Sequence, residues 1–133
     1  MTPELQKILY AEDDKDIRTI VMTILQRKTN YQIECCDTGL KALEIAQWFV
    51  PDLIILDVNM PDMDGITTFQ ALKTIELLKK VPVIFMTAKV QNHEIDNYYD
   101  LGVNYVIVKP FSPKELVELI QQTWNKSITA CSE

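Results

Sequence analysis

The sequence is poor in several residue types, and each shortage excludes a class of protein. Three cysteines (Cys35, Cys36 and Cys131) and one histidine do not have the spacing of a zinc site, and an odd number of cysteines fits reduced thiols in the cytoplasm. Thirteen basic against nineteen acidic residues give a net charge of −6, which argues against direct binding to nucleic acid. No apolar run has transmembrane length, and the polar stretch 1–7 is no signal peptide. We therefore expect a cytoplasmic protein that does not insert into membranes.

What the sequence does contain is typical of one globular domain. Apolar residues make up 47% of the chain and charged residues 24%, as in ordinary folded proteins. A chain of 133 residues is long enough to bury a core. We expect a single domain over residues 1–126. Residues 127–133 have no hydrophobic periodicity and are predicted to form a disordered tail.

Five strand patterns alternate with five helix patterns along this domain. The expected strands are Ile8–Ala11, Gln32–Cys36, Leu53–Asp57, Val81–Thr87 and Tyr105–Val108. After each strand, apolar residues recur at helical spacing. The third of these helices is expected to reach Leu77 and Leu78, and the fifth to begin at the capping sequence Ser112–Glu115. This alternation is typical of an α/β fold with a doubly wound parallel sheet.

Polar residues end four of the expected strands. Glu12 and Asp13 follow the first, Asp57 ends the third, Thr87 the fourth, and Lys109 follows the fifth. These ends meet at the edge where open α/β sheets bind ligands. Three carboxylates repel one another unless a cation lies among them, and oxygen ligands of this kind suit Mg²⁺. Asp57 is then placed as a nucleophile that forms an aspartyl phosphate; the alternative is that it caps a turn.

Four motifs resemble those of the receiver domains of two-component response regulators. They are Ile8–Asp14, Asp57–Gly65, Phe85–Ala88 and Val108–Phe111, and the likeness runs from about Lys7 to Asn125. Any one of them is moderately specific, and all four in this order are strong. The chain is similar to the single-domain chemotaxis regulators. The resemblance implies a flavodoxin-like (βα)5 fold with strand order 2-1-3-4-5.

The resemblance also implies a reaction. Asp57 would accept a phosphoryl group from a phosphohistidine of a sensor histidine kinase or of a histidine phosphotransfer protein in a phosphorelay. Lys109, the Thr87 hydroxyl and the backbone N–H of Ala88 would bind the phosphoryl oxygens. The peptide bond between Lys109 and Pro110 would be cis. The domain would catalyse its own phosphorylation and dephosphorylation but act mainly as a signalling switch.

A Mg²⁺ site follows from the same resemblance. Asp13, Asp57 and the backbone carbonyl of Asn59 would be its direct ligands, and Glu12 would act through a bound water. Asp14 lies one place beyond the acidic pair, so we expect it to be solvated or to cap the first helix.

Phosphorylation would switch the binding of a downstream effector protein to the face formed by the fourth helix, fifth strand and fifth helix. Receivers usually carry an aromatic residue three positions before the lysine, where this chain has Val106. The neighbouring Tyr105 is displaced by one residue and is therefore predicted to point to the other face of the sheet. We expect the signal to appear in the loop 88–93 and the fourth helix instead.

Other functions remain open at this point. The chain could be a receiver-like docking module with an idle site, or a receiver fragment of a longer regulator, since only eight residues follow Asn125. Phosphatases of the haloacid-dehalogenase type need a second aspartate where this chain has Asn59. Flavin binding needs a phosphate cradle after the first strand, where the carboxylates of 12–14 would repel a phosphate.

Overall fold

The computed structural model of the chain describes residues 4–88 and 92–131. Its strands are β1 (Lys7–Ala11), β2 (Gln32–Cys36), β3 (Leu53–Asp57), β4 (Val83–Thr87) and β5 (Tyr105–Val108). Its helices are α1 (Lys15–Lys28), α2 (Gly39–Phe49), α3 (Gly65–Leu72), α4 (Asn92–Leu101) and α5 (Pro113–Cys131), with a short 3₁₀ helix η1 (Glu76–Leu78). The strands pair in parallel in the order β2-β1-β3-β4-β5. This confirms the flavodoxin-like (βα)5 fold.

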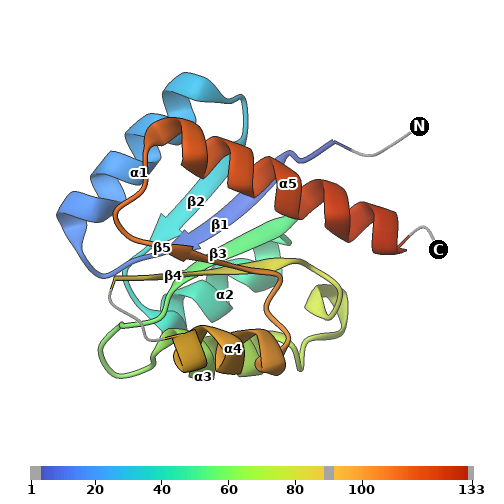
Figure 1. Cartoon of the computed structure of the whole chain (residues 1–133). Coiled ribbons are helices and arrows are strands. Elements are labelled where there is room, and N and C mark those ends of the chain that lie inside the picture. The colour runs from blue at the N-terminus through green and yellow to red at the C-terminus, as the bar shows by residue number, and fades with distance from the viewer. Residues whose placement is uncertain (1–3, 89–91, 132–133) are drawn as a thin grey trace.

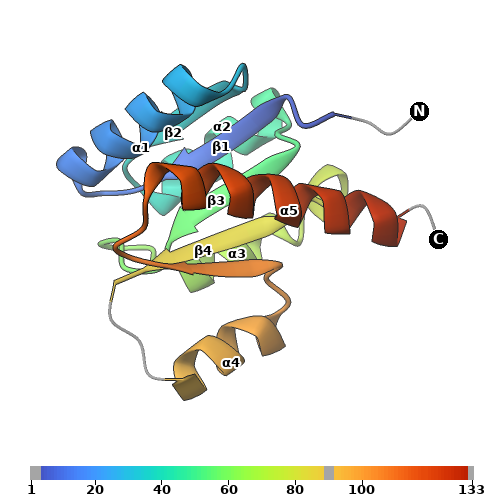
Figure 2. The same cartoon turned by 45° about the horizontal axis from the view of Figure 1, so that its top comes forward.

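The sheet is the middle of three layers. Helices α1 and α5 cover one face, and α2, α3 and α4 cover the other (Figures 1 and 2). Successive residues of a strand point to opposite faces, so β1 sends Ile8 and Tyr10 toward α1 and α5, and Leu9 and Ala11 toward α2 and α3. Every residue of the central strand β3 is buried, which explains why its sequence is apolar without alternation.

Side-chain caps mark the starts of α1, α2, α3 and α5 in the described part of the chain. The carboxylate of Asp14 accepts the N–H groups of Asp16 at 2.9 Å and Ile17 at 3.1 Å, which confirms the capping role predicted for Asp14. Thr38 caps α2 in the same manner. The hydroxyl of Ser112 accepts the N–H of Glu115 at 3.1 Å, which confirms the predicted start of the last helix.

The third helix is shorter than predicted, and the prediction that it reaches Leu78 is wrong. Helix α3 ends at Leu72, and the ammonium group of Lys73 then donates hydrogen bonds to the carbonyls of Leu78, Lys79 and Val81. These bonds fold the chain into η1, which buries Leu78 but leaves Leu77 exposed. Strand β4 likewise begins at Val83 and not at Val81, since Pro82 has no N–H to donate to a ladder.

The predicted disordered tail is wrong over residues 127–131, because α5 continues to Cys131. Ile128 packs against the core beneath this helix, and the hydroxyl of Thr129 donates to the carbonyl of Asn125 at 2.9 Å. Apolar residues recur at every fourth position of α5. The series is Leu116, Ile120, Trp124 and Ile128. This stripe keeps the last turns on the sheet. Residues 132–133 lie outside the described part.

The structure confirms the predicted displacement of the tyrosine in β5. Tyr105 packs on the side of α1 and α5, whereas Val106 belongs to the core on the side of α4 and pairs with Phe85 of β4. On the α4 side, the ring of Tyr98 meets Phe85 edge to face at 5.4 Å. Phe69 of α3 also meets Phe85 edge to face, so the aromatic contacts of Phe85 among the described residues come from α3 and α4 and not from β5.

Helix α2 ends at its C-cap residue Val50, whose backbone conformation is strained. Val50 has φ 47° and ψ 71°, a left-handed conformation that costs a branched residue about 1–2 kcal/mol. Glycine adopts it without a clash. We expect Val50→Gly to raise the free energy of unfolding by about 1 kcal/mol, measured by urea denaturation.

The matched control is Glu44→Gly in the same helix. Glu44 is exposed and lies in the helix interior, where glycine should instead lower the free energy of unfolding by about 1 kcal/mol. Destabilisation by both substitutions would show that the end of α2 is not strained.

Candidate functional site

Four polar side chains meet at the carboxyl edge of the sheet, as the sequence predicts. The register that pairs Ala11 with Leu56 places the next residues, Glu12 and Asp57, side by side. Lys109 reaches both from the end of β5. Glu12 and Asp57 are only 1% and 4% exposed, while Asp13 beside them is exposed.

The three carboxylates form a compact acidic cluster. One oxygen from each of Glu12, Asp13 and Asp57 lies within 4.8 Å of the others. Two unit charges about 4 Å apart repel by about 4 kcal/mol at an effective dielectric constant of about 20. A cluster of oxygen donors that is accessible through one exposed member is the kind of site that Mg²⁺ takes. The residues therefore fit the ion that the sequence predicts.

Lys109 neutralises part of this charge. Its Nζ lies 2.8 Å from Oε1 of Glu12 and 3.2 Å from Oδ1 of Asp57, and its side chain is 14% exposed. From the sequence, Lys109 is expected to contact a phosphoryl group and Glu12 a bound water, so the ion pair between them is not among the predictions. The predicted cis bond between Lys109 and Pro110 is present.

Burial and charge act in opposite directions on this ion pair. Burial first, and then the neighbouring Asp57, raise the pKa of Glu12 to about 7 against the opposing effect of Lys109. Burial alone would lower the pKa of Lys109, but the carboxylates of Glu12 and Asp57 hold it above its ordinary value. Lys109 therefore stays protonated and positively charged, whereas the ionised form of Glu12 is stabilised by the ammonium group beside it.

Two residues without a predicted role in the site, Arg18 and Gly65, also shape it. Arg18, on the first turn of α1, donates through Nη1 to the carbonyl of Glu12 at 2.7 Å and to that of Asp13 at 3.5 Å. Gly65 lies so close beneath the site that a Cβ there would be 2.5 Å from the carbonyl oxygen of Asp57. In the sequence, these roles correspond to an arginine one turn after the acidic residues and to a glycine after Asp64. Neither pattern indicates a site residue unless the fold is known.

The remaining predicted residues lie along the same edge. Thr87 is buried at the end of β4, and Ala88 follows it and is exposed. Asn59 is exposed two residues beyond Asp57. The predicted signalling loop 88–93 includes residues 89–91, which lie outside the described residues.

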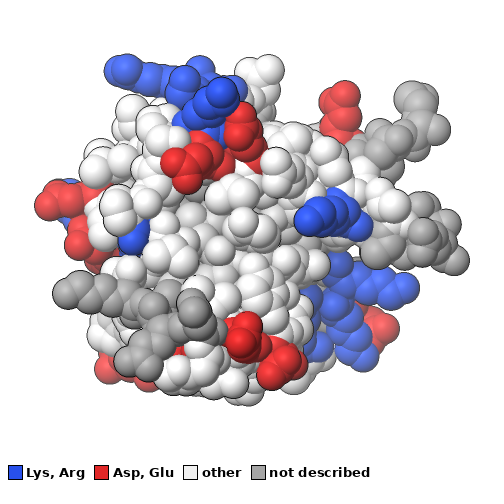
Figure 3. Space-filling view, in the orientation of Figure 1, with Lys and Arg blue, Asp and Glu red and all other residues white. Residues whose placement is uncertain are grey.

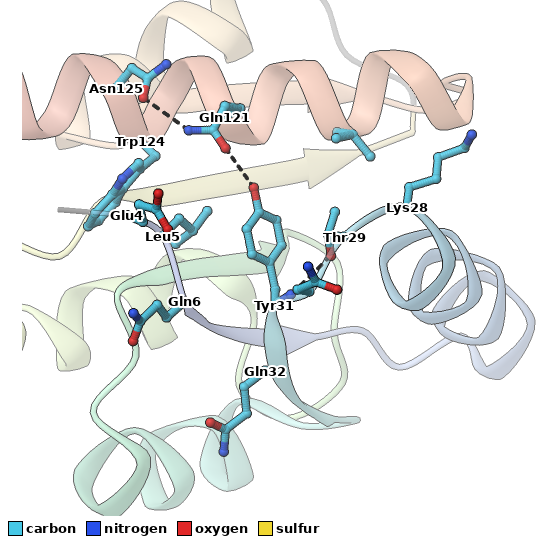
Figure 4. A pocket seen from close by; sticks show the side chains of 12 residues that line it. Glu4, Leu5, Gln6, Lys28, Thr29, Tyr31, Gln32, Gln121, Trp124 and Asn125 are labelled. Atoms are coloured by element: carbon cyan, nitrogen blue, oxygen red, sulfur yellow. Dashed lines mark hydrogen bonds between the residues drawn. The ribbon is translucent and has the colours of Figure 1, made fainter. Parts of the chain in front are cut away.

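A cavity in the described part of the chain lies away from this edge. It measures about 880 Å³ and lies between the segment before β1, the start of β2 and α5 (Figure 4). Tyr31 donates to Oε1 of Gln121 at 2.8 Å, and Gln121 donates to Asn125 at 3.1 Å across this region. The cavity adjoins the amino ends of β1 and β2, whereas ligands of such sheets bind at the carboxyl ends. The carboxylate cluster, rather than this cavity, therefore marks the candidate site.

Known proteins share this sequence and fold. Residues 8–121 match the family described as the response regulator receiver domain. The probable transcriptional regulator ycf29 of Porphyra purpurea is 38% identical over 114 residues, covering 86% of this chain and 54% of that protein. The chemotaxis protein CheY-3 of Vibrio cholerae is 32% identical over 120 residues, covering 90% of this chain and 92% of that protein.

A solved structure agrees with these matches. Chemotaxis protein CheY4 of Vibrio cholerae has a TM-score of 0.84 and 31% identity, covering 90% of this chain and 99% of that one. Several curated relatives are longer, and the chain spans about half the length of these proteins. No helix in the described ranges combines the length and apolarity needed to cross a membrane.

Phosphorylation on an aspartate is general to the family that these comparisons identify. Since the match covers most of the sequence and the fold agrees, the chain belongs to the response regulator receiver domains of two-component signalling.

Proposed function

We propose that Asp57 of this chain accepts a phosphoryl group from a phosphohistidine and so switches the binding of a partner. The observation that carries the proposal is the position of Asp57. It ends the central buried strand, its carboxylate lies 3.2 Å from Lys109, and it shares a cluster with two further carboxylates. A cation and a metal-binding cluster around one buried carboxylate suit phosphoryl transfer.

The reaction needs positioning more than acid–base chemistry. A carboxylate oxygen of Asp57 attacks phosphorus in line, the bond between phosphorus and the donor imidazole nitrogen breaks, and the imidazole keeps the electron pair. Lys109, the hydroxyl of Thr87 and the backbone N–H of Ala88 hold the phosphoryl oxygens. Attack of water on phosphorus later releases inorganic phosphate and restores the carboxylate.

Mg²⁺ would be held by Asp13, Asp57 and the backbone carbonyl of Asn59, with Glu12 contributing through a water. When bound, the ion neutralises charge on the transferring group. Lys109 would then exchange its contact with Glu12 for one with a phosphoryl oxygen. Arg18 meanwhile fixes the carbonyls of the acidic loop.

The donor would be a sensor histidine kinase or a histidine phosphotransfer protein, and the output would pass through the face of α4, β5 and α5. Tyr99 of α4 and Val108 of β5 are 40% and 42% exposed. Figure 3, which views the β5 edge, shows a wide uncharged area there. Exposed apolar groups of this kind suit a protein partner. The free thiols of Cys35 and Cys36 agree with the reducing cytoplasm that we propose as the location.

A second candidate is the receiver part of a longer regulator. It is favoured by the curated relatives named as transcriptional regulators, of which the chain covers about half. Its chemistry at Asp57 would be the same, and only the output would differ. The other alternative, a docking module with an idle site, is tested by the next experiment.

We expect acetyl phosphate with Mg²⁺ to add one phosphoryl group to the protein, detected by intact-mass spectrometry. Asp57→Asn should abolish the adduct because it removes the nucleophile, and a chelator should prevent it. Asp62→Asn is the matched control in the same loop, because Asp62 is exposed and asparagine tolerates its φ of 66°. An adduct on Asp57→Asn would refute the assignment, and none on the wild type would favour the idle module.

Neighbouring aspartates should differ in their effect on Mg²⁺ binding. Asp13→Asn should weaken Mg²⁺ at least tenfold, since it removes a carboxylate of the cluster, whereas Asp14→Asn should change it little because Asp14 caps α1. Isothermal titration calorimetry is the suitable measurement. Trp48 is exposed on α2 and Trp124 lines the cavity at the other edge, so fluorescence would report poorly. Equal losses would show that Asp13 is not a ligand.

Tyr105 should not be needed for the response to phosphorylation. Its side chain lies on the face away from α4, so Tyr105→Ala should preserve the phosphorylation-induced amide chemical-shift changes of residues 92–101. NMR spectra of the wild type and the variant, each with and without acetyl phosphate, make the comparison. Loss of these changes in the variant would identify Tyr105 as part of the switch.

A further inference from the structure

The side chain of Tyr10 places a polar hydroxyl group in the core of the protein. Its side chain is 0% exposed, and its hydroxyl has no hydrogen-bond partner among the described residues. Burying a hydroxyl in this way is unfavourable, so native proteins rarely leave one unmatched. A branched aliphatic residue would fill a central strand without this cost.

The position of Tyr10 connects it to the acidic cluster. Tyr10 and Glu12 are two residues apart at the end of β1, so their side chains leave the sheet on the same face. That face also carries Ile55 and Ile107, each two residues before the site residues Asp57 and Lys109. Tyr10 therefore lies on the same face of the sheet as these site residues, two positions before Glu12.

The phenol is suited to be a donor there. Burial, followed by the charges of Glu12 and Asp57, raises the pKa of Tyr10 above its ordinary value, so its O–H stays in place. Both oxygens of Glu12 have partners in this structure, since Oε1 accepts from Lys109 at 2.8 Å and Oε2 accepts the N–H of Asp14 at 3.4 Å. The first bond is short and the second is long.

We infer that Tyr10 is a positioning residue whose hydroxyl donates a hydrogen bond to Glu12 when Lys109 turns to the phosphoryl group. This role rests on the proposed function. The departure of Lys109 would remove the shortest hydrogen bond of a carboxylate that is 1% exposed, so that only the long bond from Asp14 and the water of the Mg²⁺ site would remain. Tyr10, two residues before Glu12 in the sequence, supplies a new donor and keeps Glu12 in place for the acceptor reaction. A hydrogen bond to a charged group is worth about tenfold or more in an equilibrium constant.

The test is Tyr10→Phe, which removes one oxygen atom and retains the ring. In the resting, metal-free protein the substitution should leave the thermal midpoint unchanged or raise it, because it deletes an unmatched polar group. In the presence of Mg²⁺ it should lower the maximal rate of Asp57 phosphorylation by acetyl phosphate about tenfold. The half-saturating donor concentration should stay the same. A purely structural role would not produce this combination.

Two further variants complete the experiment. Tyr10→Leu also lacks the donor and should show the same loss of maximal rate. Tyr31→Phe is the matched control, because it removes a hydroxyl that is hydrogen-bonded to Gln121 near the opposite edge. It should lower the thermal midpoint and leave the rate unchanged.

The outcomes separate this inference from the proposed function. If the wild type is phosphorylated and Tyr10→Phe reacts at the same rate, the role of Tyr10 is refuted while the function of Asp57 stands. An equal loss of rate in Tyr31→Phe would also refute it, since the effect would then follow stability alone. If the wild type forms no adduct, the proposed function fails and the role of Tyr10 fails with it.

Discussion

The repulsion among three carboxylates at the end of the central strands is the constraint on which the site depends. Glu12, Asp13 and Asp57 bring oxygens within 4.8 Å of one another, and two of the three side chains are buried. No arrangement of apolar core residues compensates for such charge, because only a cation or a proton can. Lys109 supplies the cation in this structure, and Mg²⁺ is the further cation that the donor set fits. The clustered carboxylates repel one another in the resting site, and they gain favourable interactions when a cation such as Mg²⁺ binds.

The fold maintains this arrangement through its backbone as much as through its side chains. Parallel pairing aligns the ends of β1 and β3. The full burial of β3 fixes the position of Asp57 along the strand direction. Arg18 holds the carbonyls of the acidic loop. Gly65 lets the loop after β3 turn back against Asp57, where any side chain would collide with the backbone. The charged groups are therefore held by a rigid frame, which is what positioning for phosphoryl transfer requires.

The predictions from sequence failed where a contact distant in sequence determined local structure. The tail from Ser127 was predicted to be disordered because it has little periodicity of its own, yet Ile128 extends the apolar stripe of α5 by one turn. The predicted third helix is longer than the observed one, because Leu77 and Leu78 continue its apolar pattern in the sequence. Lys73 instead binds the carbonyls of the following segment and folds it into η1. In both cases the apolar residues were recognised, but their partners were not.

The sequence by itself determined the five strands, the fold and the acceptor edge, since period-two and helical patterns and the polar residues at strand ends are local properties. It also determined that Tyr105 and Val106 point to opposite faces, because alternation along a strand leaves no other choice. Only the tertiary structure decided that Lys109 pairs with Glu12, that Arg18 holds the acidic loop and that Tyr10 buries its hydroxyl in the core. These depend on distances between residues up to 97 positions apart, which follow from how the strands and helices pack and not from the pattern of any one segment.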